Sequence, residues 1–452
     1  MQTNDVLDPL DEKRLRLRWL WYVLAGVLIV ISLVIEQPVL FLAALFALVI
    51  GLVPAWWYRH ALRSLEVRQH VQPSRLFFGE EVALSVTVEN QKLLPLIGLV
   101  CQAPVRPPLP VLAAQYAQRE TLGTIEFAGS LWVWERTTRR YHLRCFERGF
   151  YTVGPIMLES SDPFGWMKRR VTLPLYDTVL VYPPLASLEE LGLPKMRLFG
   201  EARTAQGLFE DPLRIVGVRD YQLGDDPRRI HWKASARAGE LRSKVYEYSY
   251  RRQVLVVLET GTPETTVVAL SREMQEFSVA VAASVAVYAL EEGYAVGLLT
   301  NCAMLTAPEL RGQAYGRAEQ RWRDPAREAE LAPDGVCVPF DDDPGQYERL
   351  LTTFARLVPY LNVPLDEVLE RRDDVVTRGT AVILVSAGQV LSAAMVERLL
   401  DMRARGNAVQ CVMIGETEQP SLTVDLPIYS VGGSEKWHAL IHAVADERRI
   451  IG

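Results

Sequence analysis

Two long apolar segments near the start of the chain dominate its hydropathy pattern. Residues 19–35 (WLWYVLAGVLIVISLVI) and 39–57 (VLFLAALFALVIGLVPAWW) contain no charged side chain, and only residues 36–38 separate them. Each segment approaches the roughly 20 apolar residues that a helix needs to cross a bilayer. The pattern therefore predicts a hairpin of two transmembrane helices. The alternative is a buried helical hairpin in a soluble core, but such helices are usually shorter and more amphipathic.

Basic residues flank this hairpin on its outer sides and are absent from its loop. They are Lys13, Arg14, Arg16 and Arg18 before the first segment, and Arg59, Arg63 and Arg68 after the second. Lys and Arg accumulate on the cytoplasmic side of membrane proteins. We therefore expect a multi-pass protein of the inner (plasma) membrane, with residues 1–60 as tail and anchor and the rest cytoplasmic. A cleaved signal peptide is not expected, because the second apolar run follows at once.

Residues 65–185 change to a period of two. Apolar side chains alternate with polar ones at Val82, Leu84, Val86 and Val88, as in a strand buried on one face. Two further strands are expected at 139–146 and 151–160, around a turn at 147–149. Short strands separated by Gly- and Pro-containing turns predict an immunoglobulin-like β-sandwich.

Residues 251–452 alternate continuous apolar runs with helical periodicity. The predicted strands are 254–259, 294–300, 380–386 and 408–415, and the predicted helices are 271–293, 346–357, 391–405 and 434–449. This alternation predicts an α/β domain with a doubly wound, mostly parallel sheet. Residues 303–345, rich in Arg, Glu, Pro and Asp, are expected to be an insert that is partly disordered or mobile.

Composition and charge bear on the partners and on the cellular compartment. The chain has 452 residues, of which 49% are hydrophobic, and a formal net charge of -6. The negative charge argues against a nucleic-acid partner, because such proteins usually present a basic face. The cysteines are Cys101, Cys145, Cys302, Cys337 and Cys411, with no C-x-x-C pair. Scattered cysteines fit a reducing compartment and ordinary packing.

A connecting segment, 186–250, contains the most distinctive stretch, VRDYQLGDDPRRIHWKASARAGEL (218–241). Asp226 suits an N-cap, Pro227 the first helical position and Gly239 a C-terminal cap. These signals predict one short helix from Pro227 to about Ala238. We expect this helix to dock through Ile230, Trp232 and Ala236, with Trp232 buried against a neighbouring domain.

At these residues the chain resembles the family called domain of unknown function fifty-eight. The matching motif residues are Asp220, Tyr221, Gly224, Asp225, Asp226, Arg228, Ile230, Trp232, Lys233, Ala234, Ser235, Ala236 and Arg237. A second match runs from Arg148-Gly149 through Gly154-Pro155 to the segment SDPFG (161–165). The resemblance covers nearly the whole chain. It implies a von Willebrand factor A-like last domain and a cytoplasmic partner, a MoxR-type AAA+ ATPase, but no settled biochemical activity.

The expected metal site of such a domain is degenerate here. A von Willebrand factor A domain binds a divalent cation through D-x-S-x-S after its first strand, where this chain has Glu259, Gly261 and Pro263. Two of these three residues have no side-chain oxygen, and hard cations need several. A later aspartate is replaced by Ser386-Ala387-Gly388. We therefore expect no metal and no cofactor, although Thr260 and Thr262 leave a shifted site open.

Other polar groups have ordinary explanations. His438 and His442 have the spacing of two zinc ligands but lack the glutamate of H-E-x-x-H. Asp341, Asp342 and Asp343 form an acidic run typical of a solvated loop. Within the motif, Asp220, Asp225, Asp226 and His231 are expected to form ion pairs and helix caps.

Two hypotheses of function remain. The first is a non-enzymatic, membrane-anchored scaffold or adaptor that works with the ATPase. The second is a hydrolytic enzyme that uses the Asp and His side chains of the motif for acid–base chemistry. An enzyme needs these groups to converge in a cleft, whereas a scaffold needs them paired.

Overall fold

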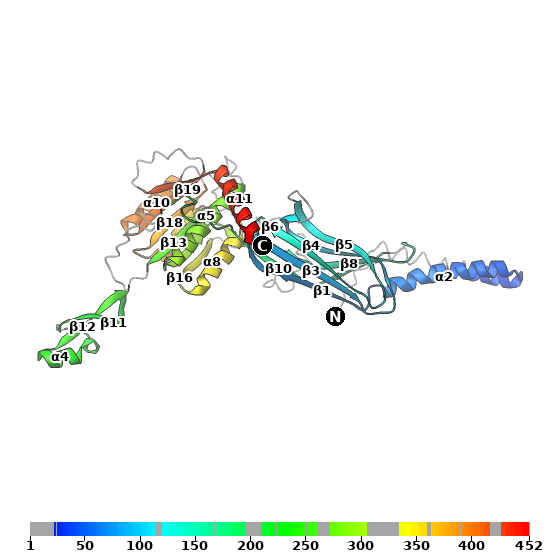
Figure 1. Ribbon diagram of the computed structural model, residues 1–452, viewed down its shortest axis with the longest axis horizontal. Helices are drawn as coiled ribbons and strands as arrows, with labels where there is room; N and C mark the ends of the chain where they lie inside the picture. The colour runs from blue at the N-terminus through cyan, green and yellow to red at the C-terminus, as the bar shows by residue number, and fades with distance from the viewer. Residues whose placement is uncertain are drawn as a thin grey trace. The chain divides into compact units, whose positions relative to one another are not determined.

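The computed structural model describes residues 22–23, 25–113, 120–165, 168–194, 209–222, 224–249, 252–259, 272–304, 334–358, 363–387, 391–415 and 426–451. The chain forms two compact units (Figure 1): Met1–Pro183 with Val444–Gly452, and Pro184–Ala443. The predicted insert at 303–345 falls largely on residues 305–333, which lie outside the described part.

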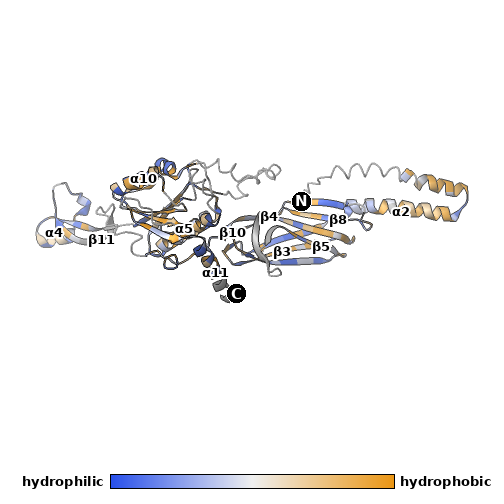
Figure 2. Ribbon diagram, turned by 90° about the horizontal axis from the view of Figure 1, so that it is seen from above, coloured by the Kyte–Doolittle hydropathy of each residue, from blue (hydrophilic) through white to orange (hydrophobic). Residues whose placement is uncertain are grey.

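The described residues from 25 to 60 are mostly helical and apolar (Figure 2). Helix α2, Pro38–His60, has 23 residues and therefore a length of about 34 Å, and by length and composition it is the one helix in the described residues that could cross a membrane. A shorter apolar helix, Ala25–Val34, precedes it. The Tyr22 hydroxyl, just before this shorter helix, donates to the carbonyl oxygen of Gly51 in α2 at 3.1 Å.

Helix α2 ends later than the predicted span, because its last turn belongs to the next domain. Trp57, Ala61 and Leu62 are buried in the hydrophobic core of the strands that follow. The second predicted span, 39–57, is thus contained in a helix that continues without a break to the domain behind it.

In its described residues, the β-domain (65–182) contains ten strands. They are β1 Leu65–Gln72, β2 Arg75–Phe77, β3 Glu81–Asn90, β4 Leu96–Ala113, β5 Glu120–Leu131, β6 Arg136–Cys145, β7 Gly149–Val153, β8 Ile156–Ser161, β9 Lys168–Leu173 and β10 Asp177–Tyr182. The order is β1-β3-β6-β4-β7-β10-β2, and the long strand β4 also pairs with β5 and β8. All pairs are antiparallel except β10 with β2.

Strand β3 confirms the alternation found in the sequence, because Val82, Leu84, Val86 and Val88 are all buried. The predicted strand at 151–160 is wrong, since it is two strands, β7 and β8. The chain turns between them at Gly154, whose φ of +119° suits glycine. A Cβ there would lie 2.2 Å from the carbonyl oxygen of Leu175.

The second unit contains a six-stranded sheet. Its strands are β13 Gln253–Glu259, β14 Ala295–Thr300, β16 Val336–Asp341, β18 Ala381–Ser386, β19 Ala408–Ile414 and β20 Ile428–Gly432. Their order is β16-β14-β13-β18-β19-β20, and all neighbours are parallel except β14 with β16. The predicted mostly parallel sheet is therefore present.

Helices cover both faces of this sheet. They are α5 Arg272–Glu291, α8 Pro344–Arg356, α9 Leu365–Arg371, α10 Ala393–Ala404 and α11 Ser434–Ile451. Leu255 and Val257 pack with α9 and α10 on one face, whereas α5 contacts β13, β14 and β18. Two short strands, β15 Ala303–Met304 and β17 Leu357–Val358, pair with each other.

Several predicted bounds shift for identifiable reasons. Helix α8 begins at Pro344 rather than 346, because the Asp343 side chain caps it. Strand β16 and helix α9 lie in or beside segments that sequence periodicity assigned to no element. Residues 184–194 join the second unit: Leu188 and Leu191 are buried, and Lys436 donates to the carbonyl oxygen of Leu191 at 2.8 Å. The β-domain thus ends at Tyr182 rather than 185.

Candidate functional site

The motif forms the closed end of a two-stranded antiparallel ribbon, whereas the sequence analysis placed it in a connecting segment. Strand β11, Phe209–Asp220, pairs antiparallel with β12, Arg242–Ser249, and the last register pair is Asp220 with Arg242. The Tyr221 amide donates to the carbonyl oxygen of Leu241 at 2.9 Å and closes the ribbon. We call residues 218–244 the ribbon tip; Leu223 within it lies outside the described residues.

Asp225 organises the first turn of the ribbon tip. Its carboxylate accepts hydrogen bonds from Arg219 Nη2 at 2.6 Å and from the Gln222 amide at 3.1 Å. The Arg219 hydrogen bond is the main reason why the pKa of Asp225 lies below its usual value. The Tyr221 hydroxyl donates to the Asp225 carbonyl oxygen at 2.9 Å. Asp225 and Tyr221 therefore hold the turn together.

The expected single helix from Pro227 to Ala238 is wrong. Asp226 does cap a helix, since its carboxylate accepts from the Arg228 amide at 2.9 Å, but this helix is a single 3₁₀ turn, Pro227–Arg229. Ile230 then bridges to Ser243, and the His231 amide donates to the Arg242 carbonyl oxygen at 2.8 Å. Pairing with β12 thus interrupts the helix.

Helix α4, Trp232–Ala238, follows this interruption. His231 Nδ1 accepts from the Ala234 amide at 3.1 Å, so His231 is its N-cap. Gly239 ends the helix in the left-handed region at φ 74°, as predicted. The buried Ser235 hydroxyl donates to the His231 carbonyl oxygen at 3.1 Å and accepts from the Arg242 amide at 2.9 Å. Ser235 thereby ties α4 to β12.

Trp232 is exposed, contrary to the expectation that it is buried. Its exposed fraction is 69%, and Ala236 is also exposed, whereas Ile230 is only 7% exposed. Helix α4 has only seven residues and rests on β12 through Ser235, and Ile230 fills the interior position. Trp232, one turn before Ala236, therefore projects into solvent.

The charged groups of the ribbon tip are of two kinds. The three aspartates are engaged locally: Asp220 pairs with Arg242 at 3.2 Å, and Asp225 and Asp226 bind as described. The fourth acidic residue, Glu240, is exposed. Basic side chains at the surface are Arg228, Lys233 and Arg237. Arg229 lies over the Tyr246 ring at 5.9 Å. The Asp and His groups each have a separate structural partner within the tip.

The second matching stretch, 148–165, lies in the β-domain. Arg148 and Asp162 are buried, and Asp162 accepts from the Phe164 amide at 3.4 Å. The Tyr151 hydroxyl donates to the Glu147 and Arg148 carbonyl oxygens, each at 3.2 Å. These residues shape turns of the β-domain.

The predicted degenerate metal site begins at the end of β13. The Ser386 hydroxyl donates to Glu259 Oε2 at 2.8 Å. Burial raises the pKa of Glu259, and the nearby Asp366 raises it further. Gly261 and Pro263 lie outside the described residues, as do Thr260 and Thr262. Among the residues that the structure describes, no three His, Cys, Asp or Glu side chains form a group that could hold a metal ion.

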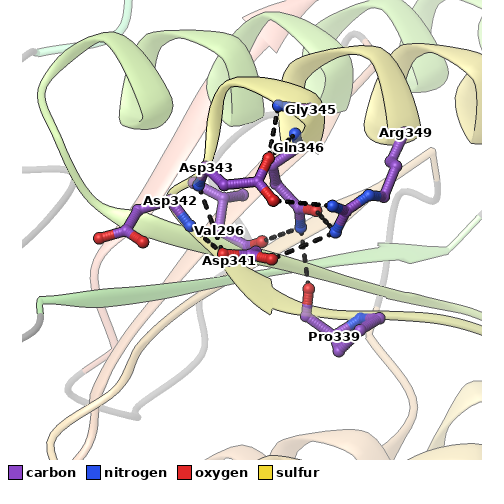
Figure 3. A network of polar contacts seen from close by, with 8 residues as sticks. All are labelled: Val296, Pro339, Asp341, Asp342, Asp343, Gly345, Gln346 and Arg349. Atoms are coloured by element: carbon purple, nitrogen blue, oxygen red, sulfur yellow. Dashed lines mark hydrogen bonds and ion pairs between the residues drawn. The ribbon is translucent and has the colours of Figure 1, made fainter.

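The acidic run 341–343 (Figure 3) forms the end of β16 and an exposed connection to α8, in agreement with the expected solvated loop. Arg349 donates to Asp341 at 3.2 Å and to Asp343 at 2.8 Å. The Arg349 hydrogen bond lowers the pKa of Asp341. The buried Gln346 amide donates to the carbonyl oxygens of Val296 and Pro339 at 2.7 and 2.8 Å. The network fixes α8 to the sheet.

The remaining candidates are surface or packing groups. His438 and His442 are exposed, and His438 lies 3.5 Å from Glu273. All five cysteines are free. Burial raises the pKa of Cys101, Cys145 and Cys411 to about 12, so their thiols are poor nucleophiles.

Comparison with known proteins points to the same ribbon tip. A family model described as "Protein of unknown function DUF58" matches residues 217–318, from the ribbon tip into the α/β sheet. The chain is 23% identical over 296 residues to the uncharacterized protein YeaD of Bacillus subtilis (strain 168), covering 62% of this chain and 69% of that protein. These matches concern proteins without a described activity.

The solved structures named below match about a quarter of the chain. A β-glucosidase from Listeria innocua in complex with glucose matches with a TM-score of 0.17 at 17% identity, covering 26% of this chain and 16% of that one. Spo0M, a sporulation control protein from Bacillus subtilis, matches with a TM-score of 0.17 at 14% identity, covering 26% and 50%. The chain thus spans about one sixth and one half of these proteins.

Proposed function

We propose that this protein is a membrane-anchored, non-enzymatic adaptor whose ribbon tip binds a protein partner. The resemblance stated above suggests a MoxR-type AAA+ ATPase as that partner. The observation that carries the proposal is the contrast between the polar residues of the motif, which maintain the local fold, and Trp232, which is exposed. Trp and Arg are the residues that most often dominate protein interfaces.

The hydrolase alternative finds less support in this geometry. Asp225, Asp226 and His231 each accept a backbone amide hydrogen and hold a different turn. An acid–base pair would require two such groups around one substrate position. The partners of these side chains favour the adaptor.

The anchor in this proposal is the apolar N-terminal region. Residues 19–35 and α2 would cross the membrane as a hairpin, with the basic residues on either side retained in the cytoplasm. The five free cysteines agree with a reducing compartment. We further propose an immunoglobulin-like β-sandwich for the β-domain and a von Willebrand factor A-like α/β-domain without metal. The mostly parallel sheet supports the von Willebrand factor A-like assignment. The absence of metal is supported by Glu259, a candidate ligand, which accepts a hydrogen bond from Ser386.

The basic surface of the ribbon tip narrows the partner's chemistry. Arg228, Lys233 and Arg237 are exposed around Trp232 in sequence, although the chain as a whole is negative. A complementary partner surface would present carboxylates around an apolar pocket. Binding through such a surface should weaken as salt concentration rises.

The test is affinity purification of the full-length protein from its native membrane, with and without ATP, followed by mass spectrometry. Trp232→Ala is the test variant, because its exposed side chain can be removed without unfolding the tip. Leu400→Ala, on the exposed surface of α10, is the matched control. We expect a MoxR-type ATPase with the unchanged chain and the control, and its loss with Trp232→Ala.

Two results would overturn parts of the proposal. Retention of the ATPase by Trp232→Ala would remove the tip from the interface. Recovery of no ATPase under either nucleotide condition would remove the partnership itself. Turnover of a substrate that disappears in a folded Asp225→Ala variant would instead establish the hydrolase.

A further inference from the structure

One end of the β-domain is built around the end of helix α2. Strand β1 begins directly after the helix, and its first residue pairs with the last residue of β3. The starts of β4, β6 and β9 and the ends of β5 and β8 lie at this same end. The register pairs that place them there are Leu65 with Asn90, Glu89 with Arg136, Leu96 with Leu131, Ile97 with Ser161, and Ser161 with Lys168. We call residues 61–64, 91–95, 132–135 and 162–165 the helix-side end.

Direct hydrogen bonds join these loops to the last turn of α2. Lys92 Nζ donates to the carbonyl oxygens of Ala61 and Arg63, and the second bond is 2.7 Å long. Arg169 donates to the carbonyl oxygens of Tyr58 and Arg59 at 2.9 and 2.8 Å. A cation near the final carbonyls of a helix is favourable, because these groups carry the negative end of the helix dipole. These hydrogen bonds join the end of the helix directly to the β-domain.

Exposed large apolar side chains of the β-domain gather at this end. Among its described residues they are Leu93 (78% exposed), Ile97 (38%), Trp132 (72%), Val133 (36%), Trp134 (63%) and Phe164 (47%). All six lie in, or one or two residues beyond, the loops of the helix-side end. Scattered surface apolar residues need no explanation, but a contiguous group of them marks an interaction surface.

The turn that carries the two tryptophans is held in place from inside the domain. The fully buried Asn90 donates to the carbonyl oxygens of Trp132 and Leu94, at 2.8 and 2.9 Å. The Glu135 carboxylate accepts from the Trp132 amide at 2.6 Å. Trp134 has a positive φ of 58°, which costs a non-glycine residue on the order of 1 kcal/mol. The hydrogen bonds offset this cost and hold the turn in a shape that leaves both indoles exposed.

We propose that the helix-side end rests on the bilayer surface, with Leu93, Trp132, Trp134 and Phe164 inserted at the boundary between headgroups and acyl chains. This inference rests on the proposed anchoring through α2. Indole rings are enriched at that boundary, because one edge is polar and the body is apolar. The exposed Arg59 and Arg63 beside the loops would meet anionic headgroups.

The lipid surface is favoured over a protein partner by continuity with the apolar helix. Trp56, 54% exposed, lies on the last turns of α2, immediately before Trp57 enters the core of the β-domain. Because no linker separates helix and domain, a bilayer that surrounds α2 up to Trp56 also meets the loops fixed to residues 58–63.

This contact would set the orientation of the β-domain. Strand β3 runs from the opposite end to the helix-side end over ten residues, or about 30 Å at the usual rise of a strand. Strand β10 pairs with β2 at that opposite end, through Tyr182 and Phe77. The chain therefore leaves the β-domain at the end away from the proposed membrane contact.

The test uses the full chain reconstituted in vesicles of phosphatidylcholine and phosphatidylglycerol. A fluorophore is attached at Val133→Cys, between the two tryptophans, or at Ser74→Cys, an exposed position at the opposite end. The unchanged chain reports any labelling of native thiols. With a quencher placed on the upper acyl chain of the lipid, we expect loss of most of the emission at position 133 and none at position 74. A Trp132→Ser/Trp134→Ser pair in the Val133→Cys chain should restore the emission.

The outcomes distinguish failure of the membrane contact from failure of the proposed membrane anchor. Chain that floats with the vesicles while position 133 stays as bright as position 74 would overturn the membrane contact and leave the anchor intact. Chain that does not float would overturn the anchor and, with it, the contact. If Val133→Cys fails to fold, the native indoles serve instead: a brominated lipid should quench the unchanged chain more than Trp132→Phe/Trp134→Phe, and equal quenching would refute the contact.

Discussion

Two motif residues in nearly adjacent positions, Ile230 and Trp232, should respond to truncation in opposite ways. The Ile230 side chain is 7% exposed and that of Trp232 is 69% exposed. Removing a buried isoleucine side chain costs about 2–5 kcal/mol, whereas a surface substitution changes stability by no more than about 0.5 kcal/mol. At the lower bound of about 2 kcal/mol, Ile230→Ala should raise the equilibrium constant for opening the ribbon tip about 30-fold. Trp232→Ala should raise it at most about 2-fold.

Hydrogen exchange is the appropriate assay, because opening of the ribbon tip need not unfold the rest of the chain. The reporting amides are those of Tyr221, His231 and Arg242, which bond across the tip. Their exchange should accelerate in Ile230→Ala and stay near the wild-type rate in Trp232→Ala. Equal acceleration in both variants, or a larger one in Trp232→Ala, would refute the assignment of Ile230 as the interior residue and of Trp232 as a binding residue.

Three further predictions concern stability. Burial raises the folded-state pKa of Glu259 above its ordinary value of 4.5, so the unfolded carboxyl ionises first and folding stability falls as pH rises from 4.5 to the raised pKa. Glu259→Gln, which can still accept from Ser386, should match the unchanged chain in stability below pH 4.5 and have a higher melting temperature at neutral pH. A difference in melting temperature between the two chains that stays the same at every pH would contradict this. Gly154→Ala should destabilise the β-domain in denaturant titration, because its Cβ would lie 2.2 Å from the Leu175 carbonyl oxygen. The control is Gly129→Ala, which has open space around its Cβ and should lose clearly less stability than Gly154→Ala. Asp343→Ala removes the cap of α8 and should cost about 1 kcal/mol in thermal unfolding, with Asp342→Ala, whose exposed carboxylate caps no helix, near neutral; comparable losses would argue against the capping role.

Periodicity predicted the long elements well, because their burial is set by many side chains at once. The alternation at Val82 to Val88 and the continuous apolar run of β13 both correspond to buried strands. The predicted helix 271–293 is also close to α5, Arg272–Glu291, after which the Gly293 amide donates to the Leu290 carbonyl oxygen. By contrast, only Gly154 and Pro155 separate β7 from β8, and the sequence analysis predicted one strand where the structure has two.

The ribbon tip was harder to predict, because its structure depends on partners far along the chain. The cap at Asp226 and the end at Gly239 are local signals and were correct. The break at Ile230 results from pairing with Ser243, and no local propensity reports that pairing. The same pairing turns Ile230 inward and leaves Trp232 exposed, so the side chain with the larger apolar area was wrongly expected inside.

The exposed aromatic residues of the two units raise the same physical question, namely why a chain keeps large apolar side chains in water. At the helix-side end, Asn90 and Glu135 hold the tryptophan turn in place, and at the ribbon tip Ser235 and His231 position the helix that carries Trp232. At the helix-side end and at the ribbon tip, hydrogen-bonded polar groups thus fix the backbone, whereas the indole side chain stays exposed to solvent. Burying such a ring is worth more than about 1.5 kcal/mol by area. This free energy, which the fold leaves unused, is the physical argument for the two proposed contacts, one with lipid at the helix-side end and one with a protein at the ribbon tip.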